Sequence, residues 1–225
     1  VQRSRAYVKQ SQLQNGASLA MFPVREVPRV AEYSVKKTYG RLLVMLEEAF
    51  SKEKPLLSLA LYYPLAHYKG QDTSIDPLKE GRQKEVASLI RTQFLKRFES
   101  SVQAFESSCA TILLKLLAFA ARHSETPAEK KLLKRWEDQH TVLLAHVNEH
   151  KAQYLDEEEP DEDIVTDEML ELVEYLSRDE YKVEEILAET FLDMNQLIEF
   201  LKELRKFKPS HDDKLKALVS LLKKD

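Results

Sequence analysis

Apolar residues between positions 81 and 123 recur three and four residues apart over many turns. This spacing is typical of an amphipathic α-helix, because residues so spaced share one face. No proline interrupts the segment, so the pattern predicts one continuous helix, roughly 60 Å long at about 1.5 Å per residue. Other elements are expected to lie along it. The apolar positions are Val86, Leu89, Ile90, Phe94, Leu95, Phe98, Val102, Phe105, Cys109, Ile112, Leu113, Leu116 and Leu117.

Two further patterns precede this helix. Residues 30–52 carry apolar side chains along one side and predict a helix. Residues 56–68 are apolar and aromatic and predict a short helix that stops near Pro64, because proline removes a backbone donor. Upstream, two prolines exclude a helix at 22–29 and favour a short extended segment or edge strand.

The segment after the long helix predicts a second rod. Thr126 is a suitable N-cap, and Pro127 suits the first helical position. We expect this helix to run to about Tyr154. The connection to the preceding helix is short, so the two helices should pack antiparallel.

The last third of the chain begins with the acidic run 156–163, which we interpret as a solvated linker. Thr166 is the expected N-cap of a helix at 167–178. Asp179 is the expected N-cap of a longer helix that ends before Pro209. Asp212 or Asp213 is expected to open the last helix.

These patterns predict an all-α fold, in which long antiparallel helices form a helical protrusion with at most one short extended segment. Five regions follow from the patterns and from the resemblance described below. They are an extended edge at 1–29, a long-helix protrusion at 30–155, an acidic linker at 156–166, a second helical segment at 167–209 and a final lead-in helix at 210–225.

Composition fits this interpretation. The chain has 225 residues, of which 32% are charged, and only four are glycine, which suits long solvated helices. The net charge of -4 hides an asymmetry, because residues 1–155 carry 24 basic against 16 acidic residues and residues 156–200 carry 2 against 18. An anionic partner is therefore expected to meet the first two-thirds of the chain.

The single cysteine, Cys109, occupies an apolar helical position and is expected to fill the core. It excludes an internal disulfide, which suits a reducing compartment, so we expect a cytoplasmic protein. The chain has no unbroken apolar run of about eighteen residues, so no membrane partner is expected.

One short motif points to metal chemistry. His146, Glu149 and His150 match H-x-x-E-H, in which two histidines one helical turn apart bind zinc and the glutamate activates water. The surrounding sequence is polar, whereas a catalytic zinc needs a dry and supported pocket. Solvent-facing histidines are therefore the favoured interpretation. The glycine-rich phosphate-binding motifs do not occur.

The segment FLKRFESS at 94–101 holds the other candidate site. Phe94, Leu95 and Phe98 are expected to face the core, and polar donors lie on the adjoining face, where they could meet a phosphate backbone. Alternatively they form a local network, and the chemistry alone favours this network. It would join Arg97 to Ser101, and Lys96 to Glu99 or Ser100.

Four strings, taken in order, resemble segments of the bacterial Swi/Snf-type superfamily II helicases. RSRAYVKQ at 3–10 is similar to the arginine-rich segment after the first motor lobe, and FPVREVP at 22–28 to the extended piece that follows it. FLKRFESSVQAF at 94–105 is similar to the LKRxESS helix of this family. HDDKLKALVSLL at 211–222 resembles the helix that leads into the second lobe.

The resemblance implies a helical segment between two RecA-like lobes, with the nucleotide-binding motifs outside it. It implies no cofactor in this segment, ATP and magnesium in a parent ATPase or helicase, and two partners: double-stranded DNA and the lobes themselves. The implied nucleic-acid or lobe contacts are Arg3, Arg5, Lys9, Lys96, Arg97, Glu99, Ser100 and Ser101. A structural or protein-interaction scaffold is the alternative, and a zinc hydrolase is a more distant one.

Overall fold

The computed structural model describes residues 5–14, 27, 30, 32–50, 57–70, 76–149 and 173–223, and the described residues form helices and no named strand. The predicted all-α fold is therefore confirmed. The α-helices are α1 (Arg5–Gln14), α2 (Val35–Tyr39), α3 (Arg41–Ala49), α4 (Pro77–Ser100), α5 (Val102–His123), α6 (Pro127–Glu149), α9 (Val183–Leu204) and α10 (Asp213–Leu222), and the 3₁₀ turns are η1 (Ala60–Tyr62), η2 (Pro64–His67) and η4 (Pro209–His211).

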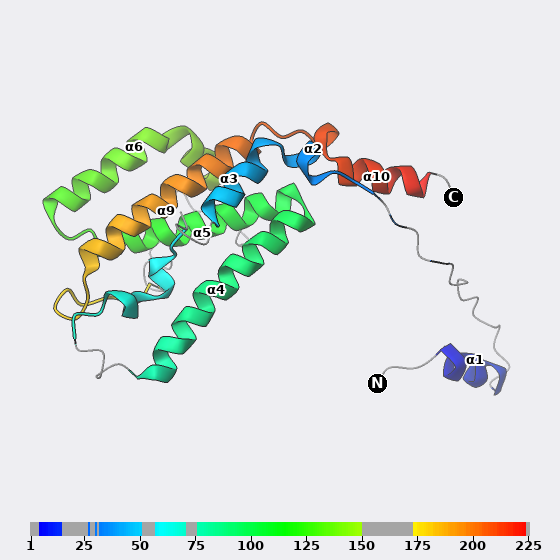
Figure 1. The fold of residues 1–225 in the computed structure, drawn as a ribbon, viewed down its shortest axis with the longest axis horizontal. Coiled ribbons are helices and arrows are strands. Elements are labelled where there is room, and N and C mark those ends of the chain that lie inside the picture. The colour runs from blue at the N-terminus through cyan, green and yellow to red at the C-terminus, as the bar shows by residue number, and fades with distance from the viewer. Residues whose placement is uncertain are drawn as a thin grey trace.

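The core forms around α5 and α9, which lie side by side through the middle of the bundle (Figure 1). α5 is apolar on nearly all sides because α4, α6 and α9 contact it, and its Cys109 is fully buried as expected. By length and composition alone α5 could cross a membrane, and it is the one helix among the described residues that passes this test. Its most apolar window is 61% buried inside the protein, and its place in the core accounts for that composition.

The prediction of one continuous helix from 81 to 123 is wrong. The chain leaves α4 at Ser100 and enters α5 at Val102, and Ser101 between them has extended backbone angles, φ -161° and ψ 156°. The two helices form a V in Figure 1 instead of a single rod. The Ser101 hydroxyl accepts a hydrogen bond of 3.0 Å from the backbone N–H of Ala104, which is the contact of an N-cap.

The predicted start of α6 is confirmed. The backbone N–H of Glu129 donates to the Thr126 hydroxyl, and the N–H of Thr126 donates to the Glu129 carboxylate at 2.9 Å, which is a reciprocal capping box. The Trp136 indole N–H donates to Asn195 at 2.7 Å and joins α6 to α9. The expected continuation of α6 from 150 to Tyr154 lies outside the described residues.

The prediction for 30–52 is wrong in two respects. The described residues before Val35 are not helical, and a break at Gly40 divides the helix into α2 and α3. Gly40 has φ 48° and ψ -116°, a conformation that a residue with a Cβ rarely adopts. The helix expected at 56–68 is two 3₁₀ turns, η1 and η2, and the second begins at Pro64.

Two expectations for the last third are wrong in the described residues. Of the helix expected at 167–178, the described part 173–178 is not helical, and Thr166 and 167–172 lie outside the described residues. The long helix begins at Val183 with Lys182 as its N-cap instead of at Asp179, because the turn before it pairs Tyr181 with Tyr68 in an isolated β-bridge. Asp212 caps α10 as expected, through a bond of 2.9 Å from the N–H of Leu215. The extended segment 22–29, apart from Val27, and the linker 156–166 lie outside the described residues.

The predicted regions 30–155 and 167–209 share one core. Buried side chains of α3, α4, α5 and α6 form a single cluster with those of α9. The burial of α9 is therefore what joins the last third of the chain to the rest of the bundle.

Candidate nucleic-acid interface

The corner between α4 and α5 positions the FLKRFESS segment. Phe94 and Phe98 are buried, as predicted, and pack edge-on against Phe105 with ring centroids 4.6 and 5.2 Å apart. Phe200 of α9 lies 6.2 Å from Phe94 in the same cluster. These aromatic contacts fix the last two turns of α4 against the core. Leu95, expected in the core, is instead 38% exposed.

The last carbonyl groups of α4 all accept hydrogen bonds. The N–H of Ser101 donates to the Arg97 oxygen at 3.1 Å, and the Tyr39 hydroxyl donates to the Phe98 oxygen at 2.8 Å. The Lys214 ammonium of α10 donates to the oxygens of Glu99 and Ser100, each at 3.0 Å. A cation at a helix C-terminus is favourable because the macrodipole is negative there. The corner is therefore held by α2 and α10 as well as by its own core.

Lys96 and Arg97 remain exposed on this fixed corner. Arg97 lines an open groove of about 590 Å³ between α4 and α5, together with polar Gln93, Ser107 and Thr111. Lys96 is not among the residues that line the groove. The cations of the segment are thus exposed to solvent, while its aromatic residues are buried in the core.

The local network expected for this segment is not found. Within the described residues, no side-chain bond joins Arg97 to Ser101, or Lys96 to Glu99 or Ser100. Ser101 acts as the N-cap of α5, and Glu99 and Ser100 contact α10 through their backbone oxygens. Of the cations in the motif, Lys96 and Arg97 are therefore exposed and make no side-chain bond to these neighbours.

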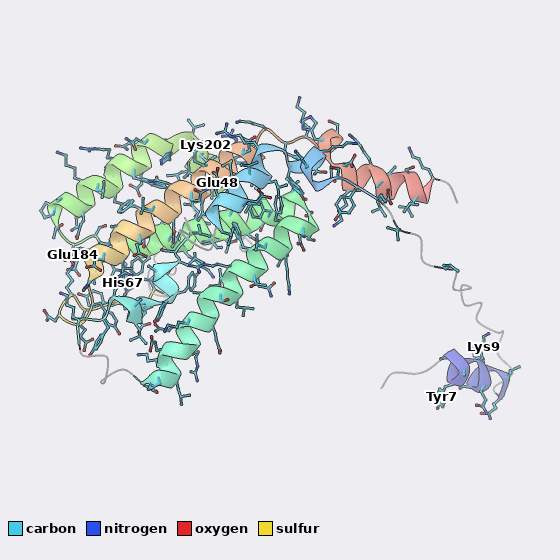
Figure 2. The ribbon with its side chains drawn as sticks, in the orientation of Figure 1. Tyr7, Lys9, Glu48, His67, Glu184 and Lys202 are labelled. Carbon is cyan, nitrogen blue, oxygen red and sulfur yellow. The ribbon has the colours of Figure 1, made fainter. Side chains whose placement is uncertain are left out.

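Of the three basic residues predicted near the N-terminus, only Lys9 has a described side chain. Lys9 is exposed on α1, which lies apart from the bundle in Figures 1 and 2. Arg5 is the first residue of α1, but its side chain is outside the described part of the structure, as is the whole of Arg3.

The H-x-x-E-H motif lies at the end of α6. His146 Nε2 is 3.7 Å from Glu106 of α5, Glu149 is the exposed last residue of the helix, and His150 lies outside the described residues. Over the ranges that the structure describes, no three histidine, cysteine or acidic side chains gather as a metal site would require. Burial raises the pKa of the Cys109 thiol well above its usual value, which suits a core residue better than a reactive one.

Comparison of this chain with protein families, curated proteins and solved structures finds no match. A function is therefore proposed from the sequence segments described above together with the arrangement of side chains.

Proposed function

We propose that this chain is the helical segment between the two RecA-like lobes of a Swi/Snf-type, DNA-dependent ATPase. In this proposal it contacts duplex nucleic acid and couples the lobes, and it has no ATPase activity of its own. ATP and magnesium would bind to the lobes of the parent protein, which would act in the cytoplasm. The order of the four sequence segments that resemble this family supports the proposal.

The observation that carries the nucleic-acid contact is the exposure of Lys96 and Arg97 on the α4–α5 corner. The buried rings of Phe94 and Phe98 hold that corner rigid, so both cations are presented from a fixed backbone. Contacts to phosphate oxygens commonly come from such lysine and arginine side chains, and they position a protein on a duplex without reading its sequence.

The test is the binding of a fluorescently labelled DNA duplex, measured by anisotropy from about 50 mM to 200 mM salt. The variant Lys96→Ala with Arg97→Ala should bind more weakly, and the slope of log affinity against log salt should become shallower by about 1.8. The matched control is Lys130→Ala with Lys131→Ala, which removes two exposed charges from α6. Equal affinities for the wild type and the Lys96/Arg97 variant would refute the proposed contact.

A structural scaffold that docks another protein surface is the second candidate. It is favoured by α10, which has no buried residue. Three of its four leucines are exposed, by 44% at Leu215, 51% at Leu218 and 70% at Leu222. Failure of the wild-type protein to bind duplex DNA even at low salt would favour this candidate over the first.

A further inference from the structure

A second groove lies between the first turn of α3 and the last turn of α9. Its volume is about 400 Å³, and most of its lining is charged. Figure 2 shows Lys202 near this end of α9, close to α3. The lining residues are Arg41 and Met45 of α3, Glu199, Lys202 and Glu203 near the end of α9, and Arg205 and Lys206 just beyond it.

The lysines and the arginines of this groove differ in their partners. Lys202 donates to Glu199 at 2.8 Å, and Lys206 donates to Glu203 at the same distance. No carboxylate oxygen of the described residues lies within 4.0 Å of either Arg41 or Arg205. The groove therefore has a net positive charge, and that charge resides on two solvent-exposed guanidinium groups.

Helix stability accounts for one of these arginines and not for the other. Arg205 follows the last residue of α9, where the macrodipole attracts a cation. Arg41 is the first residue of α3, where the macrodipole is positive and repels one. Gly40 before it supplies no side-chain cap. The α3 macrodipole thus does not favour a cation at Arg41, whereas an anion in the groove would interact favourably with both the guanidinium group and the positive end of α3.

This groove and the α4–α5 corner lie at the same end of the bundle. Tyr39, two residues before Arg41, donates its hydroxyl to the Phe98 oxygen, and its ring stacks on Phe207 just beyond α9. Figure 1 shows α2, the end of α4 and the end of α9 close together there. One extended anionic polymer can therefore approach both sets of cations from the same end.

We propose that the groove binds a phosphate of a nucleic-acid backbone through the guanidinium groups of Arg41 and Arg205. This inference rests on the proposed function and adds a second contact to it. Arginine suits the role because its planar fork donates two parallel hydrogen bonds to a phosphate, which an ammonium group does not. Lys202 and Lys206 also line the groove, where their charges are balanced by Glu199 and Glu203.

The test again uses a labelled DNA duplex and the full chain. Arg41→Ala with Arg205→Ala should weaken binding by about tenfold and make the salt slope shallower by about 1.8. Arg41→Lys with Arg205→Lys should keep the salt slope and lose part of the affinity, because the charge remains and the bidentate geometry does not. Lys130→Ala with Lys131→Ala is the control for the loss of two charges, and circular dichroism checks that each variant is folded.

The outcomes separate this inference from the proposal on which it rests. If the Arg41/Arg205 variant binds like the wild type while the Lys96/Arg97 variant is impaired, the groove is not a phosphate site, and its charge would suit an acidic protein surface instead. If only the Arg41/Arg205 variant is impaired, the groove is a contact and the α4–α5 corner is not. A wild-type protein without affinity for duplex at low salt overturns both.

Discussion

The carboxylate of Asp193, in the middle of α9, accepts a hydrogen bond of 2.6 Å from the backbone N–H of Leu59. It accepts a second bond, of 2.7 Å, from the N–H of Ser58. Leu59 has φ 56°, a left-handed conformation that costs an ordinary residue about 1–2 kcal/mol. Asp193 is fully buried, so this one carboxylate holds the loop before η1 against the core and maintains the strained backbone of Leu59.

Replacing Asp193 by alanine should therefore lower the free energy of unfolding substantially. The buried N–H of Leu59 and the partly buried N–H of Ser58 would lose their acceptor, and a buried group costs about 1–3 kcal/mol when left unsatisfied. We expect a loss of about 3 kcal/mol at pH 7, measured by urea denaturation. Asp193→Asn is the matched control, because the amide oxygen still accepts one bond, and its loss should be smaller. Equal losses for the two variants would contradict the assigned role.

The same group makes stability depend on pH. Burial raises the pKa of Asp193 to about 6, although hydrogen bonds from Ser58 and Leu59 oppose that shift. The unfolded chain has the ordinary value of 3.8, so the folded state binds the proton more tightly. The contribution of Asp193 to stability is thus greatest below pH 4 and declines as the pH rises to about 6. The difference in unfolding free energy between wild type and Asp193→Asn, measured from pH 4 to 7, should follow this course. A difference that is constant with pH would exclude it.

His123 should make the stability of the protein depend on pH in the opposite direction. Its ring is buried and accepts a bond of 3.0 Å at Nε2 from the N–H of Leu176, while Nδ1 lies 3.0 Å from the Phe119 oxygen. Because Nε2 accepts and Nδ1 donates, the ring is neutral. Burial lowers its pKa from 6.5, so the folded state binds the proton less tightly than the unfolded state does. The stabilising contribution is present above about pH 6.5 and is lost as the pH falls below it.

The variant His123→Phe tests this. It keeps an aromatic ring and leaves the Leu176 N–H without an acceptor, so at pH 7 it should be less stable by about 1–3 kcal/mol. The gap between wild type and variant should narrow at pH 5, because protonation removes the same acceptor from the wild type. Urea denaturation at the two pH values measures this difference in stability. A difference that widens at pH 5 would show that His123 does not lose its stabilising contribution on protonation.

The spacing of apolar residues predicted the buried helices, because a helix that packs on a core needs apolar side chains on the side that is buried. α6 and α9 each present an apolar face to the core, and the fold class follows from such faces. The break at Ser101 escaped the same reasoning, since the buried positions Phe94, Phe98, Val102 and Phe105 keep their spacing through the corner. Only the extended backbone of Ser101 and its bond to Ala104 interrupt the helix. A serine among polar residues is too weak a signal to locate such a break.

The candidate site was predictable only where its parts are local. Helical spacing predicts that Phe94 and Phe98 are buried and that the two cations between them are exposed. The structure shows this division, with Lys96 and Arg97 exposed. The contacts of Tyr39 and Lys214 to the end of α4 join residues 59 and at least 114 positions apart, and no local pattern encodes them. The juxtaposition of Arg41 with Arg205 depends likewise on how α3 packs on α9.

Removal of the Tyr39 hydroxyl should loosen the corner. Burial raises the pKa of Tyr39 to about 12, aided by nearby Asp212, so the group remains a donor at all ordinary pH values. Tyr39→Phe keeps the contact with the Phe98 ring and leaves the Phe98 oxygen without that donor. We expect a loss of about 1 kcal/mol by urea denaturation. Tyr33→Phe, at a more exposed tyrosine nearby, is the control and should be near neutral. A neutral Tyr39→Phe would show that the bond contributes nothing to the corner.

Lys214 should determine how firmly α10 is held. The helix buries no residue, and its described anchors lie in and around its first turn: Lys214 on the end of α4, and Asp213, which accepts from the Ser34 N–H at 2.7 Å. Replacing Lys214 by methionine removes the bonds to Glu99 and Ser100 and keeps most of the side-chain length. Hydrogen exchange of α10 amides should then accelerate by about tenfold, since an opening easier by about 1.4 kcal/mol has this effect. Lys216→Met, on the exposed side of the same helix, is the control and should leave exchange unchanged. The same acceleration in both variants would mean that α10 responds to lost charge and not to lost contact with α4.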